Sequence, residues 1–490
     1  MGRATILHRL RHPELHGSIL GRTGLAVTGA GVGGYRISSG IPSHAEALRH
    51  ALHSGINLID TSANYADGGS EDLIGLVLQE FFMKDELRRE EVVVVSKGGY
   101  IQGANYRRAI DQVEAGGGFP DVVEYAEGLW HCIAPEFLDD QITRSLERLR
   151  LESIDVYLLH NPEYYLQWAE RSGLLREEAR QEYRRRIRSA FLFLEGEVER
   201  GRIAWYGISS NTFVRAASSY DHTSLEETLA IAERITPNHH FAVLQFPGNL
   251  LEPGFITEAN GSDGRTVIEL ARERNLGALI NRPLNAIVDD ELIRLADFPD
   301  ADNPAEERDV EREIAELESV EEEFRGGGRL IGMAARDDER EALREFVAVG
   351  SILRGHWREF GTIEVFNHAL SGTFSPRLGY VAGLVRGRGI PEEGEWFDGY
   401  MERARGVLRM VSSRYAALAQ ERTNDLRERL AARLGTRLDG SFSSIAIRSL
   451  LSVPGVSSVL VGMRRVEYVN DVVQALSAHA VDAARWWKGG

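Results

Sequence analysis

Four side chains that could carry out one proton transfer follow short apolar runs in the first third of the chain. Asp60 and His160 each end such a run, Lys97 ends a third, and Tyr65 follows Asp60 in the next loop. Reduction of a carbonyl group needs a hydride donor and a general acid that protonates the developing alkoxide. A tyrosine can be that acid if its pKa is lowered, and an adjacent ammonium group favours the phenolate. The four residues therefore indicate carbonyl reduction or its reverse.

Each of the four residues is assigned one role in this chemistry. We expect Tyr65 to be the general acid and Lys97 to lower its pKa. Asp60 would hold Lys97 through a charge-assisted hydrogen bond, and neutral His160 would orient the substrate oxygen or share the proton. Taken singly, each residue has an ordinary explanation as a surface or core side chain. Catalytic residues of (β/α)₈ enzymes, however, gather at the C-terminal ends of several strands, and these four follow successive expected strands.

The elements that would position these residues alternate between short β-branched runs and amphipathic stretches of helical length, as expected for βα units around a parallel sheet. Eight strands close such a barrel. The expected strands are Gly31–Tyr35, Ile56–Thr61, Val92–Lys97, Asp155–His160, Ile203–Ser209, Phe241–Phe246, Gly277–Asn281 and Ser458–Gly462. The expected helices are Ser43–Leu52, Glu71–Phe82, Pro135–Leu149, Glu182–Arg200, Ser224–Arg234, Gly264–Arg274 and Phe442–Leu451.

The sequence therefore predicts an α/β fold, a (β/α)₈ TIM barrel with an N-terminal β-hairpin at 20–27 and a large, mainly helical insertion after the seventh strand. The 490 residues are about twice the roughly 250 of a plain barrel. The expected division is an N-terminal extension at 1–20, the first part of the barrel at 21–285, the insertion at 286–440 and the completion of the barrel at 441–490. Because it follows a strand, the insertion would emerge on the catalytic face, where it could cover the pocket.

Composition excludes several classes of protein. Hydrophobic residues make up 43% and charged residues 27%, as in soluble globular proteins, and the formal charge of −17 disfavours nucleic acid as a partner. No apolar run is long enough to cross a membrane, and the N-terminal residues do not form a signal peptide, so we expect a cytoplasmic protein without a membrane partner. The single cysteine, Cys132, can form no internal disulfide and excludes a cysteine-rich zinc site.

At the four reactive residues the chain resembles the aldo-keto reductase family. The matching segments are Asn57–Tyr65, Gly69–Glu71, Val95–Lys97, Leu158–Pro162 and Gly207–Ser210. The resemblance spans about 21–285 and 442–476 and leaves the insertion without a match. It implies that Asp60, Tyr65, Lys97 and His160 are the family's catalytic tetrad. It also implies a nicotinamide cofactor and a small carbonyl or alcohol substrate.

The same resemblance assigns residues to the nicotinamide half of the cofactor and to the substrate. Ser209, Ser210 and Gln245 would hold the carboxamide. The segment Arg282, Pro283 and Leu284 would wrap the pyrophosphate. The glycines Gly33 and Gly34 would line the substrate side together with an aromatic wall, Tyr35. Trp130 is a further pocket candidate, although buried packing explains a tryptophan equally well.

The adenosine end is assigned to the segment from Val461 to Asp471, which looks like the family's cofactor tail motif. Gly462 and Met463 stand where some members have Lys and Ser, and Val472 stands where Asn is usual. Either Arg464 or Arg465 would supply the charge that meets a 2′-phosphate, so NADP is favoured and NAD remains possible. The remaining candidates in this segment are Gly462, Tyr468 and Asp471. A solvated helix start is the alternative explanation for the arginine pair.

Two apparent motifs are rejected. Gly29, Gly31 and Gly34 have the G-x-G-x-x-G spacing of a dinucleotide fingerprint, but no helix is expected directly after Gly34. His8, His12 and His16 are spaced by four, as metal ligands on a helix would be. Pro13 and the terminal position favour a loose segment instead, so no metal is expected.

Two further functions stay open at this point. The barrel could bind the cofactor as a sensor or regulatory subunit with weak or no turnover, using the insertion as a partner surface. It could also be a sugar or alcohol dehydrogenase that works chiefly in the oxidative direction, since the same residues serve both directions. The acidic run 304–324 is a solvated helix face or a docking surface for a basic partner. The sequence does not decide the oligomeric state.

Overall fold

The computed structural model describes residues 2–289, 291–298, 301–326, 336–388 and 390–487. The chain forms two compact units. The first comprises Met1–Leu295 and Leu430–Gly490, and the second comprises Ala296–Arg429. The first unit thus takes in residues 286–295 and 430–440, which the sequence analysis assigned to the insertion.

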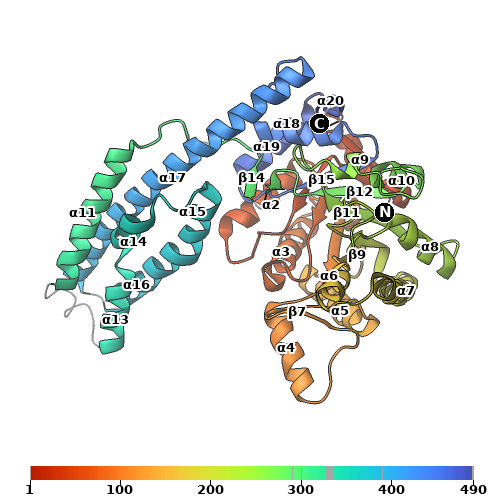
Figure 1. The fold of residues 1–490 in the computed structure, drawn as a ribbon, viewed down its shortest axis with the longest axis horizontal. Helices are drawn as coiled ribbons and strands as arrows, with labels where there is room; N and C mark the ends of the chain where they lie inside the picture. The colour runs from red at the N-terminus through yellow and green to blue at the C-terminus, as the bar shows by residue number, and fades with distance from the viewer. Residues whose placement is uncertain (1, 290, 299–300, 327–335, 389, 488–490) are drawn as a thin grey trace. The chain divides into compact units, whose positions relative to one another are not determined.

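The first unit is built around a closed barrel of eight parallel strands, which confirms the expected α/β barrel fold (Figure 1). The order around the barrel is β10-β11-β12-β15-β3-β4-β5-β9. The strands are β3 (Ala30–Gly33), β4 (Leu58–Asp60), β5 (Val93–Gly98), β9 (Ile154–His160), β10 (Ile203–Ser209), β11 (Phe241–Pro247), β12 (Gly277–Asn281) and β15 (Val456–Val461). Each overlaps one of the eight expected strands.

The barrel interior is packed with branched side chains rather than left as a pore, as in other (β/α)₈ barrels. Its buried cluster includes Leu58, Val95, Leu158 and Leu279. The expected N-terminal hairpin is confirmed: β1 (Gly17–Ile19) pairs antiparallel with β2 (Ala26–Thr28), and the turn between them contains η1 (Gly21–Thr23). Leu20, Leu25 and Val27 of this hairpin join the same cluster, so the hairpin closes one end of the barrel.

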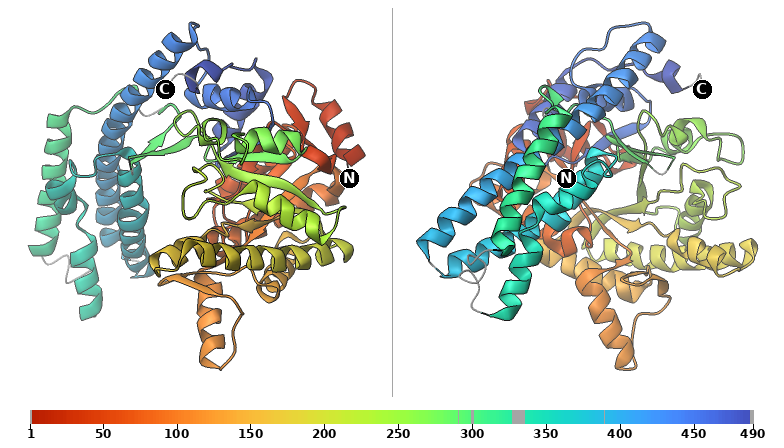
Figure 2. Two further views of the ribbon diagram at one scale, coloured as in Figure 1. Left: turned by 45° about the vertical axis from the view of Figure 1, so that its right-hand side comes forward. Right: turned by 60° about the vertical axis from the view of Figure 1, so that its left-hand side comes forward.

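Helices surround the strands (Figures 1 and 2). They are α2 (Pro42–His53), α3 (Gly69–Met83), α5 (Pro135–Leu149), α7 (Arg176–Glu199), α8 (Leu225–Ile235), α10 (Val267–Glu273), α18 (Phe442–Leu451) and α19 (Val466–Ser477). Local signals fix several starts. Pro135 occupies the first turn of α5, where its missing N–H costs nothing. Thr266 and Glu269 form a capping box on α10, and Ser441 caps α18.

Several shorter elements decorate the barrel unit. After β5 the chain forms a small antiparallel sheet in the order β6-β8-β7, which we call the accessory sheet, with α4 extending outward from the barrel in Figures 1 and 2. After β12 it forms the hairpin β13–β14. The bounds are β6 (Tyr100–Ile101), α4 (Gly103–Glu114), β7 (Val123–Ala126), β8 (Leu129–His131), α6 (Tyr164–Arg171), α9 (Gly254–Thr257), β13 (Asn285–Val288), β14 (Glu291–Arg294) and α20 (Ala484–Trp487), with η2 (Tyr65–Gly68) and η3 (Arg89–Glu91).

The N-terminal residues are ordered, contrary to the expected loose segment. Gly2–Arg11 forms α1, because Pro13 lies beyond the helix end and the helix packs on the barrel. The hydroxyl of Thr5 accepts a hydrogen bond from the Ala26 amide, and Nε2 of His8 lies 3.2 Å from the Gly55 carbonyl. The expected absence of a metal site is not contradicted: within the described ranges no cluster of three or more His, Cys, Asp or Glu side chains could hold a metal ion.

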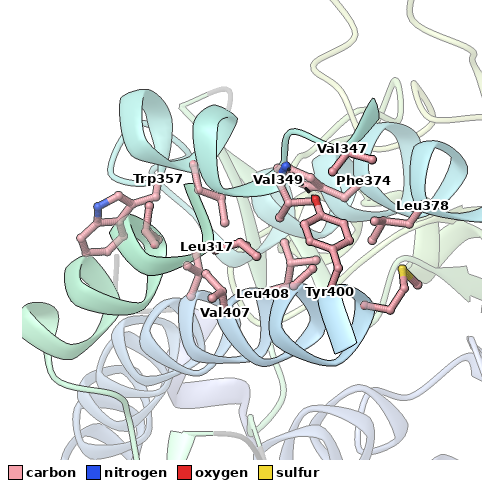
Figure 3. Close-up of a cluster of buried hydrophobic side chains, with 14 of the residues drawn as sticks. Leu317, Val347, Val349, Trp357, Phe374, Leu378, Tyr400, Val407 and Leu408 are labelled. Atoms are coloured by element: carbon pink, nitrogen blue, oxygen red, sulfur yellow. Dashed lines mark hydrogen bonds between the residues drawn. The ribbon is translucent and has the colours of Figure 1, made fainter. Parts of the chain in front are cut away.

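The second unit is helical and has a core of its own. Figure 3 shows Tyr400, Val407 and Leu408 of α17 pointing toward Leu317 of α11 and toward Val349 of α14. Glu321 is fully buried there and accepts hydrogen bonds from the Gly350 and Ser351 amides at the start of α14. The helices are α11 (Glu307–Gly326), α13 (Asp337–Phe346), α14 (Val349–His356), α15 (Ile363–Ala369), α16 (Ser375–Arg388) and α17 (Pro391–Leu434), with a π-helical turn at Leu370–Phe374.

Across the described part of the chain, no helix is both long and apolar enough to cross a membrane.

The core of the helical unit yields a stability prediction. Leu353 of α14 is 0% exposed, so Leu353→Ala should lower the free energy of unfolding by about 2–5 kcal/mol, through lost transfer free energy and a residual cavity. Leu418→Ala is the matched control, because Leu418 is 47% exposed and surface changes usually stay within about 0.5 kcal/mol. Urea unfolding followed by circular dichroism measures both, and equal midpoints would contradict the packing described.

Candidate active site

The four reactive residues meet at one end of the barrel. Asp60 ends β4, Lys97 lies near the end of β5 and His160 ends β9, while Tyr65 begins η2 after β4. Nζ of Lys97 donates hydrogen bonds to Oδ2 of Asp60 at 2.7 Å, to the Thr61 carbonyl at 2.8 Å and to Oη of Tyr65 at 3.3 Å. The rings of Tyr65 and His160 lie edge to face with centroids 5.9 Å apart. The structure therefore brings the whole tetrad together.

Burial dominates the electrostatics of this group. Lys97 is 0% exposed, and burial lowers its pKa against the opposing pull of Asp60. Burial likewise raises the pKa of Asp60. It also raises the pKa of Tyr65 well above the usual value, reinforced by the negative charge of Asp60. The expected lowering of the pKa of Tyr65 by Lys97 was thus wrong for this structure, because desolvation of the phenolate and the nearby carboxylate outweigh the ammonium.

His160 is neutral in this setting. Burial lowers its pKa well below the usual value, and the charge of Lys97 and the ring of His131 lower it further. His131 lies on β8 of the accessory sheet, and its Nε2 lies 2.8 Å from the His160 carbonyl oxygen. A neutral imidazole has one donor nitrogen and one acceptor nitrogen. His160 can therefore orient a substrate but carries no charge at neutral pH.

The residues assigned to the carboxamide divide into two groups. Gln245 donates from Nε2 to Oδ1 of Asp60 at 2.7 Å, and Oγ of Ser209 donates to Oε1 of Gln245 at 3.1 Å, which links both to the tetrad. Ser210 is fully buried and is not part of this hydrogen-bond chain to Asp60. Its hydroxyl lies 3.1 Å from those of Thr212 and Thr223, and it acts against the rise in the pKa of the nearby Glu163 carboxyl group.

The two glycines permit a close approach at the tetrad. The amide of Gly34 donates to the carbonyl of Asp60 at 2.7 Å. A Cβ atom on Gly34 would lie 2.8 Å from that oxygen and 2.7 Å from Oγ of Ser70, so a side chain there would force the loop outward. Gly33 is the register partner of Asp60, and a Cβ on it would lie 3.3 Å from the Val461 backbone. Tyr35, which follows, is 63% exposed and packs edge-on against Tyr65 with centroids 5.2 Å apart.

Arg464 and Arg465 directly precede α19, and the charges of Arg36, after β3, and Arg294, at the end of β14, act on Arg464. We call these four residues the arginine cluster. Burial lowers the pKa of Arg464, and the charges of Arg294, Arg36 and Arg465 lower it further. No side chain in the described ranges forms an ion pair with any of the four. Sequence reasoning found Arg464 and Arg465 but missed Arg36 and Arg294, and no sequence signal places Arg294 of the β13–β14 hairpin beside α19.

The segment assigned to the pyrophosphate forms the turn between β12 and β13. Arg282 has a positive φ of 53° and pairs with Glu252 at 3.0 Å, yet its Nε is buried with no hydrogen-bond partner in the described part of the chain. The same is true of Oδ1 of Asn281, which precedes it. Pro283 and Leu284 continue the turn, and the Leu284 carbonyl accepts from the Leu295 amide at 2.9 Å.

Three of the remaining candidates have contacts of their own. Trp130 packs edge-on against Tyr106 at 5.0 Å in the core of the accessory sheet, not beside the tetrad. The carboxylate of Asp471 accepts hydrogen bonds from the hydroxyls of Ser441 and Ser443 at the start of α18. Tyr468 faces Arg464, whose pKa it raises. Gly462 is exposed, and a Cβ on it would meet open space, so no close approach requires a glycine there.

The sequence analysis did not include one aromatic residue that lies beside the tetrad. Tyr100 of β6 packs edge-on against His160 with centroids 4.7 Å apart, and its hydroxyl lies 2.6 Å from Nδ2 of Asn161. Tyr100 follows Gly98 and Gly99 just after the end of β5. Its position directly after a barrel strand could have identified it as a site residue. The accessory sheet thus contributes Tyr100, rather than Trp130, to the surroundings of the tetrad.

Glu163, close to His160 in sequence, is a buried carboxyl group with only part of its hydrogen-bonding capacity used. Its Oε1 accepts from the Asn211 amide at 2.8 Å, while Oε2 is buried with no partner in the described ranges. Burial raises its pKa to about 7, and Asp221 adds to the shift. Because the folded-state pKa lies above the usual value of 4.5, Glu163 is protonated in the folded chain over a range where it is ionised in the unfolded chain.

We therefore expect stability to fall as pH rises from about 4.5 to about 7, because the unfolded state binds fewer protons there. Glu163→Gln should remove up to about 3 kcal/mol of this pH dependence, since each unit of pKa shift corresponds to about 1.4 kcal/mol. Urea unfolding at several pH values measures the effect, with Glu178→Gln on the exposed face of α7 as the control. Parallel pH profiles for wild type and Glu163→Gln would show that Glu163 does not titrate in this way.

A sequence model described as the aldo/keto reductase family matches residues 31–275, half of the chain. An NADH-specific methylglyoxal reductase of Escherichia coli is 28% identical over 172 residues, 32% of this chain and 46% of that protein. A 6-dehydroglucose reductase of Novosphingobium aromaticivorans is 28% identical over 153 residues, 29% of this chain and 41% of that protein. The chain thus spans less than half the length of these relatives.

Solved structures also resemble the chain. An aldo/keto reductase of Klebsiella pneumoniae in complex with NADP and acetate matches with a TM-score of 0.44 and 14% identity, over 95% of this chain and 91% of that one. A holo aldo-keto reductase of Bacillus halodurans matches with a TM-score of 0.45 and 14% identity, over 96% and 94%. The family model covers β3 through α10, the segment that supplies all four tetrad residues, and the chain belongs to the aldo/keto reductase family.

Proposed function

We propose that this protein is an NAD(P)-dependent oxidoreductase that reduces aldehydes or ketones to alcohols, or catalyses the reverse reaction, with Tyr65 as the general acid or base. The observation that carries the proposal is the position of one buried ammonium group. Nζ of Lys97 lies 2.7 Å from Oδ2 of Asp60 and 3.3 Å from Oη of Tyr65. A structural lysine needs a carboxylate partner and acceptors for its other protons, but none of those acceptors has to be a phenol.

The proton transfer follows from this placement. The phenol of Tyr65 is neutral because its pKa is raised, so it holds a proton to donate to the alkoxide oxygen that forms during reduction. The phenolate that remains is stabilised by the Lys97 ammonium group, and Asp60 keeps Lys97 protonated despite its burial. In the oxidative direction the same phenolate would accept the proton of the alcohol.

The chain also offers polar groups that fit a nicotinamide dinucleotide, which supplies the hydride when bound. Ser209 and Gln245 adjoin the tetrad and could hold an amide. Oδ1 of Asn281 and Nε of Arg282, at the end of β12, are buried and have no hydrogen-bond partner among the described residues, so they are available to a ligand. The arginine cluster would hold phosphate groups, since four guanidinium groups with no ion pair among the described residues would be stabilised by an anion. Its size favours NADP, which carries a 2′-phosphate that NAD lacks.

The substrate would be a small carbonyl compound or alcohol. Two relatives are named for methylglyoxal and 6-dehydroglucose, both compounds with a reactive carbonyl group. Tyr35 packs against Tyr65 and Tyr100 packs against His160, so these two tyrosines and His160 would line the substrate pocket.

Oxidation of NADPH, and separately NADH, against a panel of aldehydes, α-dicarbonyls and aldoses tests the proposal. Tyr65→Phe should lower kcat by about 10²–10⁴-fold, the usual contribution of a positioned general acid, while cofactor Kd stays unchanged. Tyr380→Phe is the control, because Tyr380 is 47% exposed on the helical unit and the substitution keeps its edge-on ring contact with Phe346. If cofactor binds but neither direction turns over, the protein is a cofactor-binding sensor or subunit instead.

A second experiment addresses cofactor choice. Arg464→Gln and Arg294→Gln should each weaken NADPH binding by about 10–100-fold, because a hydrogen bond to a charged group contributes about 1.5–3 kcal/mol. NADH binding should change less, since NADH has no 2′-phosphate. Fluorescence titration gives both Kd values, and Arg405→Gln at an exposed position of α17 is the control. An equal loss of affinity for both cofactors would indicate that the arginine cluster binds the pyrophosphate rather than the 2′-phosphate.

A further inference from the structure

The loop that carries Tyr65 contacts the start of α4 on both sides of that tyrosine. Before it, Nδ2 of Asn64 donates a hydrogen bond to Oε1 of Gln102 at 3.0 Å. After it, the carboxylate of Asp67 accepts from the Ala104 amide, which lies 3.0 and 3.1 Å from its two oxygens. We call these two contacts the loop clamp.

α4 has no side-chain cap of its own, and Asp67 supplies one. The first amides of a helix have no partner within the helix, and the residue before the helix usually accepts from one of them. Gln102 holds that position before α4, but its side chain makes no such bond. The carboxylate of Asp67 replaces it from another loop, and the positive end of the helix dipole favours a negative charge there. The clamp therefore includes a charge-assisted hydrogen bond.

The approach of Asp67 to α4 requires a glycine at position 103. Gly103 has a positive φ of 55°, and a Cβ atom on it would lie 2.5 Å from Oδ1 of Asp67. A side chain at this position would push the carboxylate away from the Ala104 amide. A single methyl group on α4 would thus break the contact while the Tyr65 loop keeps its own sequence.

The Tyr65 loop needs such a restraint because its backbone is strained. Ala66 and Asp67 have φ of 50° and 55°, a region that is unfavourable for residues with a Cβ atom. Oη of Tyr65 lies 3.3 Å from Nζ of Lys97, whereas the other two hydrogen bonds of Lys97 measure 2.7 and 2.8 Å. A small relaxation of the loop would therefore break the bond between Lys97 and the phenol.

We propose that Asn64 and Asp67 are positioning residues, which hold Tyr65 within hydrogen-bonding reach of Lys97 by clamping the strained loop to the start of α4. The effect on catalysis rests on the proposed carbonyl reduction, whereas the position of Tyr65 does not. The competing explanation is that Asp67 caps α4 and has no influence on Tyr65.

Three substitutions at position 67 separate the clamp from the backbone strain. Asp67→Asn keeps an oxygen that can accept from the Ala104 amide and a residue type that tolerates positive φ. Asp67→Gly relieves the strain but removes the contact, and Asp67→Ala removes the contact and keeps the strain. Gly103→Ala breaks the contact from the side of α4. If the clamp positions Tyr65, the asparagine variant resembles wild type and the other three do not.

The surroundings of Tyr65 can be measured without cofactor or substrate. ¹³C NMR of the full chain labelled at Cζ of tyrosine reports the hydrogen bonding of each phenol, and Tyr65→Phe identifies the Tyr65 signal by its loss. We expect this signal to shift in Asp67→Gly, Asp67→Ala and Gly103→Ala. It should stay in place in Asp67→Asn and in the control Asp111→Ala, which changes an exposed aspartate of α4. An unshifted signal in Asp67→Gly and Gly103→Ala would overturn the proposal, even if Asp67→Ala did not fold.

Steady-state kinetics tests the effect on catalysis. Asp67→Gly and Gly103→Ala should lower kcat about tenfold to a hundredfold, because misplacing a reacting group by about 1 Å can cost about a hundredfold in rate. KM and the cofactor Kd should stay unchanged, and Asp67→Asn should keep the wild-type kcat. An unchanged kcat together with a shifted Tyr65 signal would overturn the catalytic part of the proposal. No turnover by wild type would instead refute the proposed function, and the NMR result would still decide whether the clamp positions Tyr65.

Discussion

The saturated hydrogen bonding of one buried ammonium group is the constraint on which the site depends. A charged lysine in the interior is strongly unfavourable unless it is paired and each of its protons has an acceptor. Lys97 has three protons and three acceptors: Oδ2 of Asp60, the Thr61 carbonyl and Oη of Tyr65. Because one of the three is the phenol of Tyr65, the geometry that satisfies the buried charge also fixes the position of the proposed general acid.

The barrel makes this saturation possible, because adjacent strands end at one level. β4 and β5 pair with Asp60 opposite Val95, and β5 and β9 pair with Lys97 opposite Leu158. The loop after β4 then returns to place Tyr65 over Lys97. That return requires unusual backbone: Ala66 and Asp67 have φ of 50° and 55°. Non-glycine residues in this region cost of order 1 kcal/mol or more each, so the contacts of the loop must hold them there.

The sequence predicted correctly those features of the barrel that follow from the alternation of buried strands and amphipathic helices. All eight strands were predicted, because buried parallel strands form short β-branched runs, and the tetrad was predicted because such strands deliver their last residues to one mouth. Quantities that depend on tertiary packing were not predictable. The pKa of Tyr65 was expected to fall but rises, because the sequence does not show how completely the phenol is desolvated. Likewise, Tyr100 rather than Trp130 reaches His160, and the approach of Arg294 to Arg464 depends on how a hairpin folds back.

The segment between β5 and α5 departs from the simple barrel pattern, yet it contacts both the loop that carries Tyr65 and the loop that follows His160. On the Tyr65 loop, Asp67 accepts from the Ala104 amide at the start of α4, at 3.0 Å. On the His160 loop, Asn161 bonds the hydroxyl of Tyr100, and the His160 carbonyl bonds His131. A barrel enzyme normally changes substrate through its loops and keeps its chemistry on its strands. Under the proposed function, this segment would line the pocket through Tyr100, and it also restrains the strained turn beside Tyr65 through its contact with Asp67. Substrate range and catalytic geometry would then not change independently in this segment.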